Sequence, residues 1–198
     1  MPKTVAIIPA RYDSSRFPKK LTYELLGKPI IIAVYDNVKA VSEIDDVIIA
    51  TDSKEIMDIC SKNNAKAIMT SKSHTSGTSR IIEAAKKIDC DIIINVQGDE
   101  PLINEEILSP IIKCFEDEKV DIATIKSKIE KLKECDCERI EKLEQLRWLY
   151  NGMKIKVLET NQFIHGIDTI EDLEFVQEYL RRHAQSELNN EYLHKKNY

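Results

Sequence analysis

The clearest chemical character in the chain belongs to a basic loop, Pro9–Lys20, which reads PARYDSSRFPKK. Four cations, two serines and two prolines follow directly on an apolar run. Arginine and lysine neutralise phosphate groups, and a guanidinium can bind two phosphate oxygens at once. A solvated surface loop is the simpler alternative. A position at the end of a predicted strand favours a nucleotide-phosphate site instead.

An acid pair follows a second apolar run, Asp91–Val96, in the sequence Gln97-Gly98-Asp99-Glu100-Pro101. A magnesium ion that carries a nucleotide takes one or two carboxylates, several waters and phosphate oxygens. Glu100 is equally suited to capping the helix that follows. Asp99 is therefore the candidate metal ligand.

Two further turns leave alternatives open. Ser76, Gly77 and Thr78 suit a helix N-terminus whose amides face an anion or a base edge, but an ordinary helix cap explains them equally well. Asp168 precedes a predicted helix start, so it is either a capping acid or a second acid of the site, and spacing does not decide between these. The nearby His74 is expected to be a loop residue and not a catalytic base.

A scaffold that gathers these loops at one edge is indicated by the rest of the chain. Strands are predicted at Thr4–Pro9, Asp46–Thr51, Ala65–Met69, Asp91–Val96, Val120–Ile125 and Lys154–Leu158. Helices are predicted at Pro29–Val41, Ser53–Lys62, Ser76–Lys87, Asn104–Asp117, Glu138–Tyr150 and Thr169–Arg182. The alternation indicates an α/β fold, with a mostly parallel sheet covered by helices on both faces. Such sheets bind ligands beyond the carboxyl ends of their strands, where the candidates fall.

One α/β domain is predicted over residues 1–183, with a polar tail over 184–198. Within the domain, the charged segment Lys126–Asp136 is expected to form a short bridge outside the core. Thr169, followed three positions later by Asp172, predicts a capping box, and Gly152 is placed to end the helix near Tyr150.

Composition narrows the classes of function. The net charge is −5 and there is no long basic block, which speaks against nucleic-acid binding. No apolar run approaches the length of a membrane span or a signal peptide, so a cytoplasmic protein with reduced cysteines is expected. Cys135 and Cys137 lack a second thiol or histidine pair at zinc-finger spacing, which favours plain small residues over a metal site.

Five motifs together resemble the 3-deoxy-manno-octulosonate (Kdo) cytidylyltransferases: IIPARYDSSRFPKK, HTSGTSR, NVQGDEPLI, ERIEKLEQLR and HGIDTIEDLE. They occur in the family's order and cover about Thr4–Ile125 and Glu138–Tyr179. Sialic-acid cytidylyltransferases share the P-A-R opening but are less similar elsewhere. The resemblance implies a Rossmann-like nucleotidyltransferase fold. It also implies Mg²⁺-dependent transfer of CMP from CTP to Kdo or a related acidic sugar, with release of pyrophosphate, for lipopolysaccharide or capsule synthesis.

The resemblance also implies roles for individual residues. The nucleotide site would comprise Pro9, Ala10, Arg11, Ser14, Arg16, Lys20, Ser76, Gly77, Thr78 and Arg80. Gln97 would bind the sugar, and Asp99 and Asp168 would bind magnesium. Arg11, Lys20 and Asp99 would be the catalytic residues.

The chain departs from the family pattern at Lys19, Leu21 and Ser79, and it lacks several tens of residues between Ile125 and about Cys135. In the family that region supplies much of the sugar pocket and part of a dimer interface, so a homodimer is left open here. Three hypotheses follow: an active enzyme with a reduced acceptor site, a catalytically impaired CTP-binding paralogue, and a nucleotidyltransferase with a different small acceptor. The retained acids favour the first and the missing region favours the second.

Overall fold

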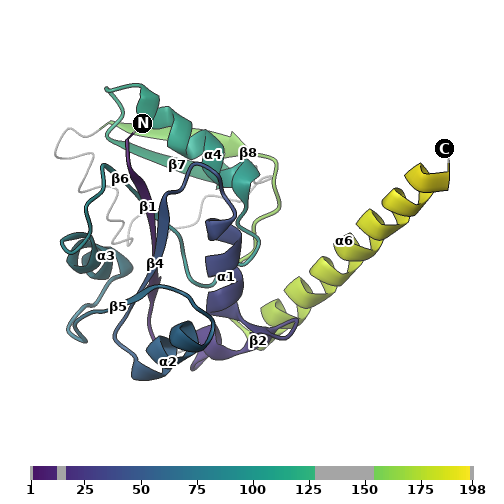
Figure 1. The fold of residues 1–198 in the computed structure, drawn as a ribbon, viewed down its shortest axis with the longest axis horizontal. Coiled ribbons are helices and arrows are strands. Elements are labelled where there is room, and N and C mark those ends of the chain that lie inside the picture. The colour runs from purple at the N-terminus through teal and green to yellow at the C-terminus, as the bar shows by residue number, and fades with distance from the viewer. Residues whose placement is uncertain (1, 13–16, 128–153, 197–198) are drawn as a thin grey trace, which may run out of the picture.

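A four-stranded parallel sheet forms the centre of the computed structural model, which describes residues 2–12, 17–127 and 154–196 (Figure 1). Its order is β5-β4-β1-β6. The strands are β1 (Thr4–Ala10), β4 (Asp46–Thr51), β5 (Ala67–Met69) and β6 (Ile92–Asn95). In the register of the sheet, Ile7 of β1 lies between Ile48 of β4 and Asn95 of β6.

Helices cover both faces of this sheet. They are α1 (Ile30–Lys39), α2 (Lys54–Lys62), α3 (Gly77–Ala85) and α4 (Glu105–Lys113). Successive side chains of a strand point to opposite faces. Accordingly, Ala6 and Ile8 belong to the larger core, which holds the apolar residues of α1, α2 and α4. Val5 and Ile7 belong to a smaller core with Ile81 of α3. The predicted two-sided α/β architecture is therefore observed.

The two remaining predicted strands form a sheet of their own. β7 (Ile122–Ser127) pairs in parallel with β8 (Ile155–Thr160), and neither joins the central sheet. Short turns complete the main body: the 3₁₀ helices η1 (Lys20–Thr22) and η2 (Cys114–Glu116), and the hairpin of β2 (Glu24–Leu25) and β3 (Lys28–Pro29). The sequence pattern did not distinguish one continuous sheet from two.

The last helix, α6 (Ile170–Lys196), begins where the capping box predicts and continues well past the predicted end at Arg182. Its C-terminal part extends away from the body through the segment expected as a polar tail (Figure 1). The predicted helix Glu138–Tyr150, Gly152 and most of the bridge Lys126–Asp136 lie outside the described residues.

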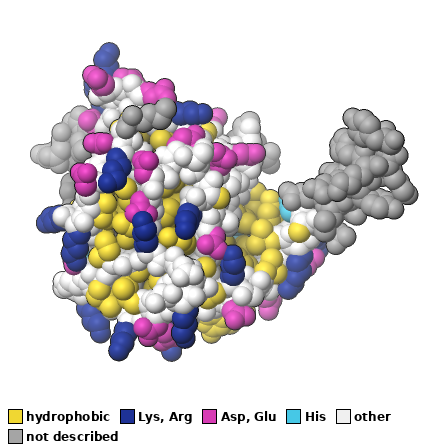
Figure 2. All heavy atoms as spheres, viewed as in Figure 1, with side chains coloured by type: hydrophobic (Ala, Val, Ile, Leu, Met, Phe, Trp, Pro, Cys, Tyr) yellow, Lys and Arg dark blue, Asp and Glu magenta, His cyan; other side chains and the backbone are white. Residues whose placement is uncertain are grey.

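Charged side chains of both signs are mixed over the face of the body seen in Figure 2. Among the described residues, no helix combines the length and the apolar character that crossing a bilayer requires.

Candidate active site

Three distant segments meet at the carboxyl edge of the central sheet. Lys20, from the loop after β1, donates a hydrogen bond to Oδ2 of Asp99, which follows β6. The same Nζ lies 2.9 Å from Oδ1 of Asp168, which precedes α6 and is 148 positions away in the chain. The structure thus places Asp168 beside the first acid, a placement that spacing alone left open. The capping box itself is formed by Thr169 and Asp172.

The ammonium of Lys20 is largely enclosed, with 12% of the side chain exposed. Burial by itself would lower the pKa of Lys20, but the hydrogen bonds and charges of Asp99 and Asp168 outweigh it and raise the pKa above its ordinary value. The lysine therefore stays protonated at neutral pH. One cation already lies between two carboxylates here.

A divalent metal fits this pair of acids. Carboxylate oxygens are hard donors, and magnesium typically takes one or two of them with waters and phosphate oxygens. The position of the Lys20 ammonium shows that Asp99 and Asp168 can share one cation. Within the described ranges, no group of three or more His, Cys, Asp or Glu side chains is arranged to hold a metal.

The backbone holds the two acid loops together. The amide of Ile167 donates to the carbonyl oxygen of Asp99 at 2.8 Å, and the Ile167 side chain is fully buried. On the other side of the loop, Gly98 packs tightly: a Cβ there would lie 3.3 Å from the carbonyl oxygen of Pro9 and 3.2 Å from Cδ1 of Ile31. A residue without a side chain therefore lets the Asp99 loop approach the end of β1.

The start of α3 forms another side of the candidate site. Arg11 Nη1 donates to the carbonyl oxygen of Thr75 at 3.2 Å, which joins the loop after β1 to this turn. Ser76 caps the helix by accepting from the amide of Ser79 at 3.1 Å. A Cβ at Gly77 would be in contact with the Pro9 ring, at 3.4 Å. The structure therefore brings Pro9 and Arg11 together with Ser76 and Gly77.

Arg80 is buried beneath the start of α3 and does not lie at its surface. Its side chain is fully buried, with Nη1 donating to Thr70 Oγ1 at 2.6 Å and Nη2 donating to Asp52 Oδ2 at 2.6 Å. Asp52 and Thr70 directly follow β4 and β5. Arg80 thus ties two strand ends to α3. Sequence reasoning missed both partners, although their positions after strands are a signal that could have identified them.

The other predicted site residues have varied positions. Gln97 is exposed, and its amide donates to Asn95 Oδ1 at 3.0 Å. Ala10 is buried at the end of β1, and Thr78 lies in the first turn of α3. Ser14 and Arg16 lie outside the described residues.

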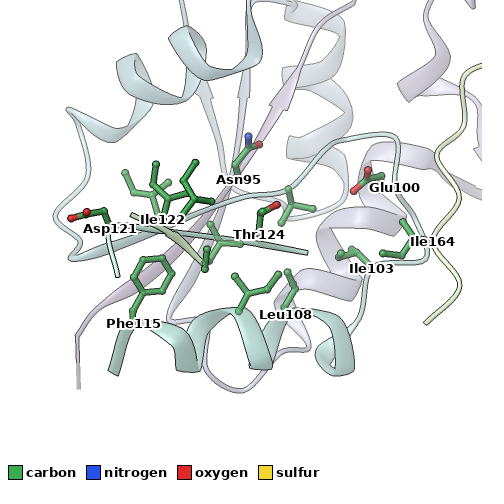
Figure 3. A pocket seen from close by; sticks show the side chains of 15 residues that line it. Asn95, Glu100, Ile103, Leu108, Phe115, Asp121, Ile122, Thr124 and Ile164 are labelled. Atoms are coloured by element: carbon green, nitrogen blue, oxygen red, sulfur yellow. The ribbon is translucent and has the colours of Figure 1, made fainter. Parts of the chain in front are cut away.

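Glu100 faces a different region from its neighbour Asp99. Burial, with a further contribution from the charge of Asp99, raises the pKa of Glu100 to about 7. It lies at one end of a cavity of about 590 Å³ between β6, α4 and the β7–β8 pair, near Ile103 and Ile164 (Figure 3). The lining of this cavity includes Glu100 but not Lys20, Asp99 or Asp168. The cavity therefore adjoins the site but is separate from the carboxylate pair.

Several known proteins with similar sequences or structures are cytidylyltransferases. A family model described as cytidylyltransferase matches residues 5–134. A 3-deoxy-manno-octulosonate cytidylyltransferase of Koribacter versatilis is 33% identical over 237 residues, covering 90% of this chain and 90% of the relative. Its counterpart in Fusobacterium nucleatum is 36% identical, covering 90% and 97%. A solved CMP:2-keto-3-deoxy-manno-octonic acid synthetase in complex with CTP is 28% identical, with a TM-score of 0.84, and the match covers 91% of this chain and 99% of that one.

These similarities confirm the predicted nucleotidyltransferase fold and the resemblance carried by the five motifs. The alignment with the Koribacter protein extends over 237 residues, more than the 198 of this chain, so the relative carries residues with no counterpart here. This agrees with the predicted shortening. The segment to which the prediction assigns it, about 125–135, lies mostly outside the described residues. The chain therefore belongs to the 3-deoxy-manno-octulosonate cytidylyltransferase family.

Proposed function

We propose that this chain transfers CMP from CTP to 3-deoxy-manno-octulosonate, or to a related acidic sugar, and releases pyrophosphate. The observation that carries the proposal is the meeting of Lys20, Asp99 and Asp168 at the carboxyl edge of the sheet. Relatives that are 33% and 36% identical are named for this activity, and the solved synthetase was obtained with CTP. The product would serve lipopolysaccharide or capsule synthesis, and an enzyme that consumes CTP would act in the cytoplasm.

In the proposed reaction the anomeric hydroxyl oxygen of the sugar attacks the α-phosphorus of CTP. An oxygen–phosphorus bond forms, the hydroxyl proton is lost to water, the bond from the α-phosphorus to the bridging oxygen breaks, and pyrophosphate leaves. A displacement of this kind is catalysed chiefly by positioning and by neutralising phosphate charge. The protein's own contributions are therefore cations that bind the phosphates and surfaces that orient the base and the sugar.

Arg11 and Lys20 are the described cations suited to bind the phosphates. Arg11 lies beside the start of α3, whose turn would orient the nucleotide. Lys20 would exchange its bonds with Asp99 and Asp168 for bonds with phosphate oxygens. Gln97 is exposed next to the same loop and would contact the sugar. Magnesium held by Asp99 and Asp168 would supply further charge neutralisation and would acidify the attacking hydroxyl.

The test is an assay of pyrophosphate release by the purified chain with CTP, Mg²⁺ and a panel of acidic sugars. Release should require both the metal and an acceptor, and Asp99→Asn should lower kcat/KM by about 100- to 1,000-fold, the usual effect of losing one preorganised electrostatic contact. Asp36→Asn removes an exposed carboxylate that pairs with Lys28, and it serves as the matched control that should retain activity.

A second candidate, a CTP-binding paralogue with impaired catalysis, is favoured by the residues that relatives carry and this chain does not. The same assay separates the two. Measurable CTP binding without pyrophosphate release for any acceptor would refute the transferase proposal and support the paralogue.

A further inference from the structure

We propose that Asp172, supported by His165, is a positioning residue that fixes Asp168 in the orientation needed to share a divalent cation with Asp99. The inference rests on the proposed function, because it concerns the metal pair of that site. Among the described residues, Asp172 makes no hydrogen bond or ion pair with Lys20 or Asp99. It would therefore act on the metal pair only through Asp168.

One oxygen of Asp172 accepts three hydrogen bonds. Oδ2 lies 3.0 Å from the amide nitrogen of Asp168, 2.9 Å from the amide nitrogen of Thr169 and 3.0 Å from Thr169 Oγ1. A capping box requires the acid to reach back only to the N-cap residue, here Thr169. The bond to the amide of Asp168, one residue earlier and outside the helix, is additional. The carboxylate therefore holds the backbone of the candidate ligand as well as the helix start.

The other oxygen fixes the carboxylate itself. Oδ1 lies 3.0 Å from Nε2 of His165. The imidazole is packed against two aromatic rings, Phe163 at 5.9 Å in a stacked arrangement and Phe175 at 5.0 Å between ring centroids. Rings held in this way restrict rotation of His165, so Asp172 has both oxygens engaged and little freedom to turn.

Two backbone hydrogen bonds consequently hold Asp168 in place. The residue before it donates its amide to the carbonyl oxygen of Asp99, and Asp168 donates its own amide to Asp172. With both amides fixed, the side chain leaves the backbone toward Lys20 and the first acid. Groups that orient a metal ligand from behind typically account for 10- to 100-fold in metal affinity.

The experiment measures binding of the Mn²⁺–CTP complex, with Mn²⁺ as a spectroscopic probe for the magnesium site. Because CTP itself chelates Mn²⁺, the electron paramagnetic resonance signal is followed as protein is added to a fixed solution of Mn²⁺ and CTP, with the protein-free solution as the reference. Asp172→Ala should weaken binding about tenfold or more, since the orienting group is lost. Asp172→Asn should restore affinity to within about threefold, because the amide oxygen can accept the same backbone bonds while its NH₂ faces His165 in the other tautomer.

The matched control is Asn104→Ala, which removes the cap of α4, where Asn104 Oδ1 accepts from the amide of Ile107 at 3.1 Å. Loss of such a cap costs about 1 kcal/mol of stability. This variant should melt at a lower temperature and bind Mn²⁺ as the wild type does. If Asp172→Ala does not fold, His165→Phe keeps the ring stack and removes only the bond to Asp172, and it should weaken Mn²⁺ binding at least twofold.

Each outcome of these measurements either supports or overturns the positioning role of Asp172. Wild-type affinity in Asp172→Ala, or in His165→Phe where that variant is used, would overturn the positioning role while leaving the proposed function intact. Equal weakening in Asn104→Ala would also overturn it, because the effect would then reflect stability alone. A wild-type chain that leaves the signal of Mn²⁺–CTP unchanged would overturn the metal site itself, and the inference with it.

Discussion

Lys20 Nζ lies 2.9 Å from Asp168 Oδ1 while it also donates to Asp99, so a single ammonium joins two acids from opposite ends of the chain. The same side chain is one of the two cations proposed to bind the nucleotide phosphates. Under that proposal Lys20 has two sets of partners, the carboxylates and the phosphates, and bonds to one set leave fewer of its three N–H donors for the other. Binding of CTP and of a metal should be linked through this one residue.

Lys20→Met should change the two affinities in opposite directions. Without CTP, Mn²⁺ should bind more tightly, because the competing ammonium is gone, while CTP should bind more weakly. Hydrogen bonds to charged groups contribute about 1.5–3 kcal/mol, which corresponds to about ten- to a hundredfold in either constant. Calorimetry of each ligand alone measures both effects. Lys28→Met breaks the exposed pair with Asp36 and should change neither; weaker Mn²⁺ binding in Lys20→Met would contradict the competition.

Gly98→Ala should destabilise the protein and disturb the site. The new Cβ would lie 3.3 Å from the carbonyl oxygen of Pro9, a backbone atom that cannot move aside without shifting β1. Overpacking of this kind costs about 1–3 kcal/mol in the free energy of unfolding. Urea denaturation measures it. Gly166→Ala is the control, since its nearest neighbour would be 3.9 Å away; equal losses in the two variants would show that contact distance is not the cause.

The ion pair of the buried Arg80 with Asp52, whose side chain is 18% exposed, allows support of the turn at Ser76 and Gly77 to be separated from direct contact with the proposed nucleotide. Removing Asp52 leaves the buried guanidinium without its charged partner, at a cost of about 3–5 kcal/mol, and removing Arg80 should cost less because Asp52 is partly solvated. Arg80→Met and Asp52→Asn should therefore both lower stability, and the double variant should lose less than the sum. Denaturation of all four proteins gives the coupling energy.

CTP affinity then discriminates between the two roles of Arg80. A residue that only supports the turn predicts similar losses of CTP binding in Arg80→Met and Asp52→Asn, measured where both variants are folded. A large loss in Arg80→Met alone would show that the guanidinium contacts the nucleotide itself.

Glu83 should make a pH-dependent contribution to stability. Its pKa is lowered to about 2, first by the amide of Ser71 and then by His74, from an ordinary value of 4.5. Because the folded state holds the proton less tightly, this contribution is present above pH 4.5 and is lost as the pH falls toward 2.

Glu83→Gln should therefore be less stable than the wild type at pH 7, with the difference shrinking between pH 4.5 and 2. Urea denaturation at several pH values follows it. The exposed Glu118→Gln is the control and should show no such change. A difference for Glu83→Gln that stays constant with pH would contradict the assignment.

Local signals predicted the elements well. The helix starts at Ser76 and Asn104 were placed correctly, because side-chain caps are encoded within four residues of sequence. The central strands were found within a few residues, because buried parallel strands are continuously apolar. The end of α6 was missed because the polar residues after Arg182 are still good helix formers, although they lose the apolar periodicity by which a helix is recognised in a sequence.

Long-range relationships were less accessible. Nothing near Asp168 in the sequence indicates that it meets a lysine 148 positions earlier, so only the resemblance placed it with Asp99. In the same way, a basic residue in a nucleotide-binding turn looks available for phosphate, whereas Arg80 is fully buried against Asp52. The separation of β7 and β8 from the central sheet is a matter of strand pairing across the fold, which the apolar pattern of either strand does not record.

The bond from the Ile167 amide to the carbonyl oxygen of Asp99 has a consequence for how the protein opens. The bond joins residues that are far apart in the sequence and lie within the candidate site. The side chain of Ile167 is buried in the same core as β6 and the start of α6. Local fluctuations can expose hydrogen bonds that only span a loop, whereas this one should break only when the C-terminal segment detaches as a cooperative unit. The slow exchange of one backbone hydrogen would then report when the two acids are together.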